Sequence, residues 1–199
     1  ANTLPIPMMN IINGGAHANN GLDFQECMIM PIGFTKFSDA LRSGVEIFSN
    51  LKKLLSEKGF SVAVGDEGGF APNINNLEEA LSYISESVEN SGYKLGEEIF
   101  ISIDAAASEF FDKDIYILKG ENKKYSSREL VTFWENICNK FPIVSIEDPF
   151  DENDWSGFKE LTKRIGKKVQ IVGDDLFVTN KKRLLKGINS NSANSILIK

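Results

Sequence analysis

The segment 142–150 reads Pro142-Ile143-Val144-Ser145-Ile146-Glu147-Asp148-Pro149-Phe150, and its pattern decides the fold of this chain. An almost continuous apolar run ends directly on a carboxylate. Strands that are covered on both faces read as such runs, whereas a half-exposed strand alternates between apolar and polar residues. We therefore expect a buried strand over residues 143–146, with Glu147 at its carboxyl end.

The same pattern occurs three more times along the chain. Apolar runs cover residues 99–103, 169–172 and 195–198, and the charged residues that follow them are Asp104, Asp174 (after Gly173) and Lys199. Helical periodicity fills the intervals, over residues 126–141, 154–165 and 179–188, with Ser126 and Glu129 as a capping box and Asp154 as a second cap. Alternation of this kind predicts parallel strands with helices outside them.

The first hundred residues are less regular. Two short strands are expected at 7–12 and 27–31, separated by a loop rich in Gly and Asn. A stripe of apolar residues predicts one helix, which ends at Gly59. A second helix is expected after Asn76, which would cap it. The stripe of the first comprises Leu41, Val45, Phe48, Leu51 and Leu55, and that of the second Leu77, Leu81, Ile84 and Val88.

A doubly wound sheet and a (β/α) barrel both satisfy this alternation, and the strand ends favour the barrel. In a barrel, Asp104, Glu147, Asp174 and Lys199 would gather at the carboxyl-terminal rim, where barrel active sites lie. Three converging carboxylates repel one another unless a cation holds them, and carboxylates with water are the ligands that Mg²⁺ prefers. The alternative is that each acid merely caps the helix that follows it.

Composition narrows the classes of function. The chain has 199 residues, 42% of them hydrophobic, and a net charge of −6, which is typical of a globular protein and argues against a nucleic-acid-binding surface. No apolar stretch is long enough to span a bilayer. Cys27 and Cys138 form neither a disulfide framework nor a metal-binding spacing, and we expect a cytoplasmic protein with reduced thiols.

Three further places are candidates for chemistry. The loop 65–72 sets Asp66 and Glu67 among three glycines, so it could bring a carboxylate close to a ligand, although an acidic turn is the alternative. His17 is the single histidine and lies in a Gly/Asn-rich loop, where burial in a core is not expected. The pair Gln25-Glu26 opens the second strand and is uninformative by itself.

Long motifs in this chain resemble the enolase family, and the bacterial type within it. The resemblance runs across essentially the whole chain and rests on residues 4–18, 65–73, 107–110, 142–150, 172–180 and 195–199. It implies a (β/α)8 TIM-type barrel that is incomplete here, with about six of the eight strands. It also implies that the chain, which starts at Ala1, is a piece of a longer enzyme, lacking a preceding α+β domain and the last two barrel strands.

The resemblance also implies roles for particular residues. Asp104, Glu147 and Asp174 match the ligands of Mg²⁺, of which the family binds two ions per active site. Glu67 matches the general acid and Lys199 the base, with Lys199 also at the substrate. His17, Gln25 and Glu26 match residues that contact or orient the substrate. The reaction implied is the reversible dehydration of 2-phosphoglycerate to phosphoenolpyruvate in glycolysis and gluconeogenesis.

Expectations about partners follow from the same resemblance. The substrate would be a small phosphorylated molecule, with no direct nucleic-acid contact and no membrane span, and the full-length protein would be a homodimer or higher homo-oligomer. The 199 residues alone would be inactive. A different class of function, a binding role at a cell surface or in an RNA-processing assembly, has no dedicated motif here. Another proton-abstracting member of the superfamily is a weaker alternative, because the Glu67 loop favours enolase itself.

Overall fold

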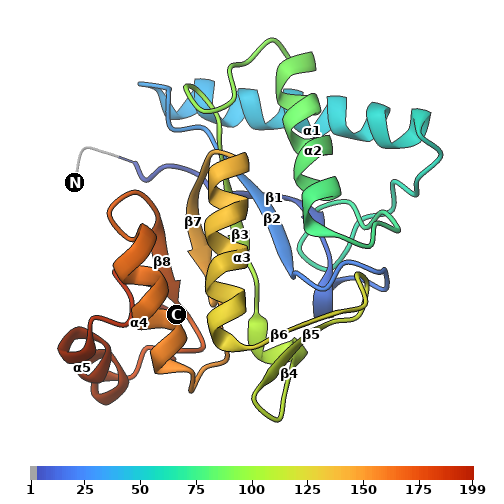
Figure 1. The fold of residues 1–199 in the computed structure, drawn as a ribbon. Helices are drawn as coiled ribbons and strands as arrows, with labels where there is room; N and C mark the ends of the chain where they lie inside the picture. Colours follow the sequence, from blue (N-terminus) through green and yellow to red (C-terminus); the bar gives the residue numbers. More distant parts are fainter. Residues whose placement is uncertain (1–3) are drawn as a thin grey trace. The chain divides into compact units, whose positions relative to one another are not determined.

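The computed structural model describes residues 4–199, which form two compact units. The first is Ala1–Ser102 and the second Ile103–Lys199, and strand β3 (Phe100–Asp104) runs across the boundary (Figure 1). No helix in residues 4–199 combines the length and the apolar character needed to cross a membrane.

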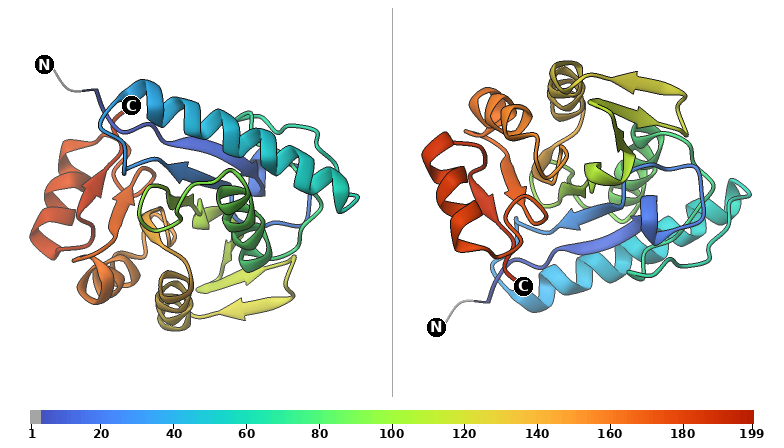
Figure 2. Two further views of the ribbon diagram at one scale, coloured as in Figure 1. Left: turned by 90° about the horizontal axis from the view of Figure 1, so that it is seen from above. Right: turned by 90° about the horizontal axis from the view of Figure 1, so that it is seen from below.

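The first unit contains an antiparallel strand pair. Strand β1 (Met9–Asn13) pairs with β2 (Glu26–Met30), and a 3-10 turn, η1 (Gly15–His17), follows β1. The register shifts between Asn10 and Ile12, where a bulge interrupts the ladder. Both strands lie within two residues of the predicted bounds. Figure 2 shows the pair lying along the first long helix of this unit.

That helix, α1 (Phe37–Glu57), packs against α2 (Leu77–Asn90). The α2 prediction is confirmed, because its four stripe residues are buried and the Asn76 side chain accepts the Glu79 amide at 2.8 Å. The stripe predicted for α1 is partly wrong, since Leu41 is 46% exposed and Val45 60% exposed.

The buried face of α1 instead starts with small residues. Ala40, Ser43 and Gly44 are buried, and a Cβ on Gly44 would lie 2.3 Å from the Met9 Cε. Small side chains let the helix approach β1 closely, and Ile47, Leu51 and Leu55 then continue that face. A search for large apolar residues cannot detect a contact face that begins with alanine, serine and glycine.

The second unit contains the parallel strands expected from the sequence. Strands β7 (Ile143–Glu147), β8 (Gln170–Gly173) and β9 (Ser195–Ile196) pair in that order, with Glu147 opposite Val172 and Gly173 opposite Ile196. Strands β7 and β8 are buried over most of their length, as predicted for strands covered on both faces. Strand β9 is two residues long and shorter than its apolar run.

Three helices accompany these strands: α3 (Ser127–Lys140), α4 (Trp155–Ile165) and α5 (Lys181–Ser190). The predicted capping box on α3 is confirmed, and Asp154 caps α4 by accepting the Gly157 amide at 2.9 Å. On the buried side of α3, the Trp134 indole donates to the Pro149 carbonyl at 3.1 Å. Because Pro149 follows β7 closely, this bond ties α3 to the loop at the strand end.

The start predicted for α5, at Thr179, is wrong by two residues. Val178 and Thr179 have φ values of 43° and 51°, in the left-handed region that β-branched residues rarely adopt, and neither can join a right-handed helix there. Asn180 provides the cap instead, accepting the amides of Lys182 and Arg183. A threonine and an asparagine are both good caps, so composition alone does not separate them.

The second unit also contains a small antiparallel sheet, which was not predicted from the sequence. It consists of β4 (Phe111–Asp112), β5 (Ile115–Leu118) and β6 (Lys123–Tyr125), after a 3-10 turn η2 (Ala107–Phe110). Lys113 and Asp114, both with positive φ, form the two-residue turn between β4 and β5. Hairpins of this kind usually carry Asn-Gly or Asp-Gly, and Lys-Asp lacks that signal.

Candidate active site

The carboxyl ends of β7 and β8 bring three carboxylates together. Glu147 is the last residue of β7, Asp148 follows it, and Asp174 comes directly after β8. One oxygen from each lies within 4.8 Å of the other two. The parallel pairing of Glu147 with Val172 explains the convergence, because it aligns the two strand ends.

Lys199 lies beside this cluster. Its Nζ is 2.7 Å from an oxygen of Asp174, and its backbone N–H donates to the Thr179 hydroxyl at 3.1 Å. The hydrogen bond with Asp174, together with the charges of Asp175 and Glu147, raises the pKa of Lys199 above its ordinary value. The sequence prediction that Lys199 and the strand-end acids lie near one another is therefore met for Glu147 and Asp174.

Asp104 stands at the end of β3, and its carboxylate accepts the Ala106 amide at 3.0 Å. The next residue, Ala105, donates its N–H to the Glu147 carbonyl at 3.0 Å, so the ends of β3 and β7 are neighbours. Asp104 is not one of the three carboxylates that lie within 4.8 Å of one another. Its role as a metal ligand stays a prediction from the resemblance.

Asp148 is a residue of the cluster that the strand-end argument did not single out. It is 4% exposed, and burial raises its pKa to about 7, against the lowering effect of the backbone N–H groups that it accepts. The sequence gives only a weak indication of this residue, namely that Asp148 is the neighbour of Glu147 in the chain. Its hydrogen bonds, which involve a different loop, are visible only in three dimensions.

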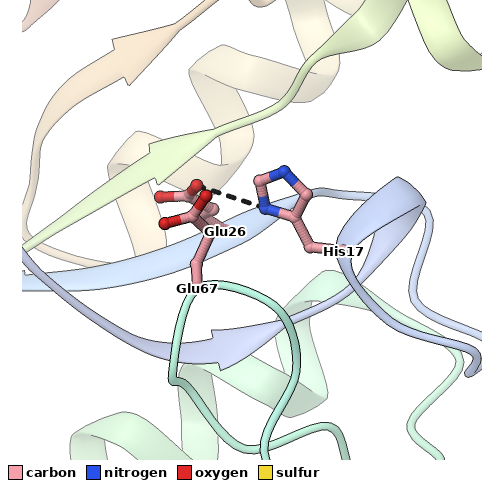
Figure 3. Close-up of side chains that lie close together, drawn as sticks. All are labelled: His17, Glu26 and Glu67. Atoms are coloured by element: carbon pink, nitrogen blue, oxygen red, sulfur yellow. Dashed lines mark ion pairs between the residues drawn. The ribbon is translucent and has the colours of Figure 1, made fainter.

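The first unit holds a second cluster. His17 Nδ1 lies 3.3 Å from a carboxylate oxygen of Glu26, and the Glu67 carboxylate points to the same place (Figure 3). Ligand atoms of these three residues lie within 4.8 Å of one another. Burial raises the pKa of Glu26, His17 lowers it, and repulsion by Glu67 raises it.

Local backbone contacts hold the Glu67 loop against His17. The Gly65 amide donates to the Gly69 carbonyl at 2.8 Å, and the Asp66 amide donates to the His17 carbonyl at 3.2 Å. Gly68 has a φ of 82°, which favours glycine, and Glu67 itself is exposed. The flexible acidic loop predicted from the sequence thus places a carboxylate at His17.

Gln25 lies just before β2 and is half-buried. Its carbonyl accepts the Gly14 amide at 3.0 Å, which ties it to the loop that leads to His17. Gln25 is not one of the three residues of the His17 cluster, and its role as a substrate contact stays a prediction.

The strand-end acids fit a hard divalent cation such as Mg²⁺. Glu147 and Asp174 offer carboxylate oxygens, which are the ligands that this ion prefers. Asp174 already bonds the ammonium group of Lys199, so this position attracts positive charge. The His17 cluster adds an imidazole nitrogen to two carboxylates, a ligand set less typical of Mg²⁺.

Parallel strands with accompanying helices, and with acids and a lysine at the carboxyl ends of the strands, define an α/β protein, a class that includes the barrels. Comparison with protein families identifies which barrel. The family model described as "Enolase, C-terminal TIM barrel domain" matches residues 1–199, and the chain belongs to that family. The predicted fold class, a TIM-type barrel present here as an unclosed sheet, is thereby confirmed for the part of the chain that the structure describes.

Proposed function

We propose that this chain belongs to an enolase that interconverts 2-phosphoglycerate and phosphoenolpyruvate. Membership of the enolase family supports a lyase of the Mg²⁺-dependent superfamily. One observation carries the finer assignment: the Lys199 ammonium lies 2.7 Å from Asp174, within the acidic cluster at the strand ends. That pairing sets a candidate base directly beside a candidate cation site.

Lys199 is proposed as the base that removes the proton on C2 of the substrate. That carbon adjoins a carboxylate, and its proton is very weakly acidic because loss of the proton adds negative charge to the carboxylate. When bound, Mg²⁺ supplies positive charge that stabilises this second negative charge. Lys199 must be neutral to accept a proton, and a cation at Asp174 would compete with the ammonium for the same oxygen.

Glu67 is proposed as the acid that donates a proton as the 3-hydroxyl leaves as water. Ligand atoms of Glu67, Glu26 and His17 lie within 4.8 Å of one another, so the Glu67 carboxylate is close to two residues that are proposed to contact or orient the substrate. His17, Gln25 and Glu26 are proposed to contact or orient the substrate. Asp104, Glu147 and Asp174 are proposed as the cation ligands, for two Mg²⁺ ions per site in the whole enzyme.

The remaining expectations belong to this proposal. The enzyme would be of the bacterial type, act in the cytoplasm in glycolysis, and assemble as a homodimer or higher homo-oligomer. The 199 residues would form part of its barrel domain and would not dehydrate the substrate by themselves.

The test is the substitution Lys199→Ala in the full-length protein, with Lys168→Ala as the matched control, because Lys168 is an exposed lysine on the same unit. Formation of the enolpyruvate product is followed by its ultraviolet absorbance, with 2-phosphoglycerate and Mg²⁺ present. We expect Lys199→Ala to lower turnover by at least about 100-fold, which is typical for loss of a general base. Near-normal turnover in Lys199→Ala would contradict the assignment of the base.

A further inference from the structure

We propose that Asp148 is a positioning residue, which fixes the loop carrying Asp174 and does not itself bind the cation. This inference rests on the proposed function, because it assigns Asp174 to the cation site. It concerns a buried carboxylate for which the resemblance implies no role.

Three backbone N–H groups of one loop donate to the Asp148 carboxylate. The amides of Asp174 and Leu176 donate to Oδ1 at 3.1 and 3.4 Å, and the amide of Asp175 donates to Oδ2 at 2.7 Å. Successive amides that converge on one anion form a concave backbone site, which compensates a negative charge. The carboxylate of Asp148 therefore holds the first three residues after β8 in a single conformation.

The backbone of Asp148 fixes the carboxylate in turn. Its φ is 39°, in the left-handed region that aspartate tolerates better than most residues, and its N–H donates to the Val172 carbonyl at 3.0 Å. The residue is buried. With its main chain bonded to β8 and its side chain bonded to the loop after β8, Asp148 connects β7 to both.

Arg183 holds the other side of the same loop. Its Nε donates to the Leu176 carbonyl at 2.6 Å, and its Nη2 donates to the Glu152 carbonyl in the loop after β7. Leu176 therefore has its amide on Asp148 and its carbonyl on Arg183. Asp148 therefore holds the two peptide groups that adjoin Asp174, and Arg183 holds the same loop two residues further on, which together limit where the Asp174 side chain can point.

The partners of the two aspartates separate their roles. Both oxygens of Asp148 accept backbone N–H groups, whereas Oδ2 of Asp174 contacts a cationic side chain. A carboxylate already directed at three amides would have to give up part of that bonding to bind a metal ion. Outer residues that orient metal ligands typically change metal affinity by 10- to 100-fold when they are substituted.

The test uses the full-length protein with Asp148→Asn and, as the charge-matched control, Asp175→Asn on the same loop. Hydrogen–deuterium exchange is measured without metal, in a peptide that covers residues 174–176. We expect Asp148→Asn to speed exchange there at least about tenfold and to leave β7 and α3 unchanged. Exchange as slow as in Asp175→Asn would overturn the proposal, and so would equal acceleration throughout the second unit.

A second measurement tests the positioning of the site. Mn²⁺ alone, detected by electron paramagnetic resonance, titrates the protein without substrate. We expect Asp148→Asn to weaken Mn²⁺ binding at least about tenfold relative to Asp175→Asn. Faster exchange with unchanged Mn²⁺ affinity would overturn the proposal. Weaker Mn²⁺ binding with unchanged exchange would also overturn it, because that combination indicates that Asp148 is a direct ligand of the cation.

The wild-type protein supplies a test if Asp148→Asn does not fold. The amides of residues 174–176 lie outside any helix or strand, yet the proposal requires them to be protected in metal-free protein. Rapid exchange of these amides in the wild type would overturn it. Failure of the proposed function has a different signature, namely no dehydration by the wild type while the exchange pattern stays as expected.

Discussion

Lys199 is proposed to remove a proton from the substrate and Glu67 to donate one, and experiments can separate these two proton transfers. A base removes the C2 proton before an acid assists the departure of the hydroxyl. In the full-length protein, Lys199→Ala should therefore abolish the exchange of the C2 proton with solvent deuterium. Glu67→Gln should keep that exchange while dehydration falls by at least about 100-fold.

Both reactions are followed with the same substrate, exchange by nuclear magnetic resonance and dehydration by absorbance. Lys168→Ala again serves as the control and should change neither. Exchange that persists in Lys199→Ala, or that disappears together with dehydration in Glu67→Gln, would mean that the acid and base are assigned to the wrong residues.

Cys27 gives a residue-scale prediction about pH. It is fully buried, and burial raises the pKa of its thiol from the ordinary value of 9.0 to about 12. The folded state therefore keeps the proton that the unfolded state loses above pH 9. The stability that depends on this proton is complete below pH 9 and is lost as the pH rises from 9 to 12.

We expect the destabilisation caused by Cys27→Ala to shrink by about 1.4 kcal/mol between pH 8 and pH 10, since only the wild type loses the thiol contribution. Urea unfolding at both pH values measures the difference. Ile29→Val, a change in the same buried strand without an ionisable group, should cost the same at both. A cost of Cys27→Ala that is independent of pH would show that the thiol ionises equally in both states.

At the residue scale, the sequence predicts those site residues whose position follows from a strand end. Glu147 and Asp174 converge because parallel pairing aligns the ends of β7 and β8. Asp148 escapes such reasoning, because its role depends on amides 26 to 28 positions away. Every residue except proline has a backbone N–H, so the type of the donor residue does not reveal such a hydrogen bond.

At the scale of elements, two glycines in helices allow a paired prediction. Ala is the better helix former by about 1 kcal/mol, so Gly→Ala is favourable where space permits. A Cβ on Gly187 of α5 would lie 2.4 Å from the ring of Phe177, which is rigid and buried. A Cβ on Gly44 of α1 would instead meet the flexible tip of Met9 at 2.3 Å.

We expect Gly187→Ala to destabilise the protein, because overpacking against a rigid ring costs about 1–3 kcal/mol and exceeds the gain in helix propensity. Gly44→Ala should be close to neutral, since the thioether can move aside. Thermal unfolding of both variants beside the wild type measures the contrast. Equal effects of the two substitutions would show that the nature of the neighbouring side chain does not decide the cost.

Elements with strong local signals were predictable, and those fixed by tertiary contacts were not. The caps at Asn76, Ser126 and Asp154 mark α2, α3 and α4, because capping is a local interaction. The contact face of α1 depends on Gly44 lying against Met9, far away in the sequence. The sheet of β4, β5 and β6 depends on a Lys113-Asp114 turn that composition does not reveal.

At the scale of the whole molecule, the family assignment defines the type of fold, and the two units show how the candidate site residues are distributed along the chain. Family membership covers all 199 residues and defines the chain as barrel sequence. The structure divides it into two units, each with one of the two clusters of candidate site residues. The proposed base and cation ligands belong to the second unit, and the proposed acid belongs to the first.

The positions of the two tryptophans have an optical consequence, because both lie in the second unit. Trp134 is fully buried, whereas Trp155 lies 4.0 Å below the Lys186 ammonium and 5.2 Å from the Arg183 guanidinium. Two cations over one ring attract anions, so iodide should quench Trp155 and spare Trp134. Iodide quenching should vanish in Trp155→Phe and persist in Trp134→Phe, and the reverse result would contradict these environments.

Arg183 joins this ring to the Leu176 carbonyl, and through it to the loop that carries Asp174. Light emitted by Trp155 should therefore change when that loop becomes ordered or disordered, with no label added. The first unit contains no tryptophan and therefore contributes no tryptophan emission to such a measurement. Trp155 is thus an intrinsic fluorescent reporter for the loop that carries Asp174. Its signal comes only from the second unit, which also contains Asp148.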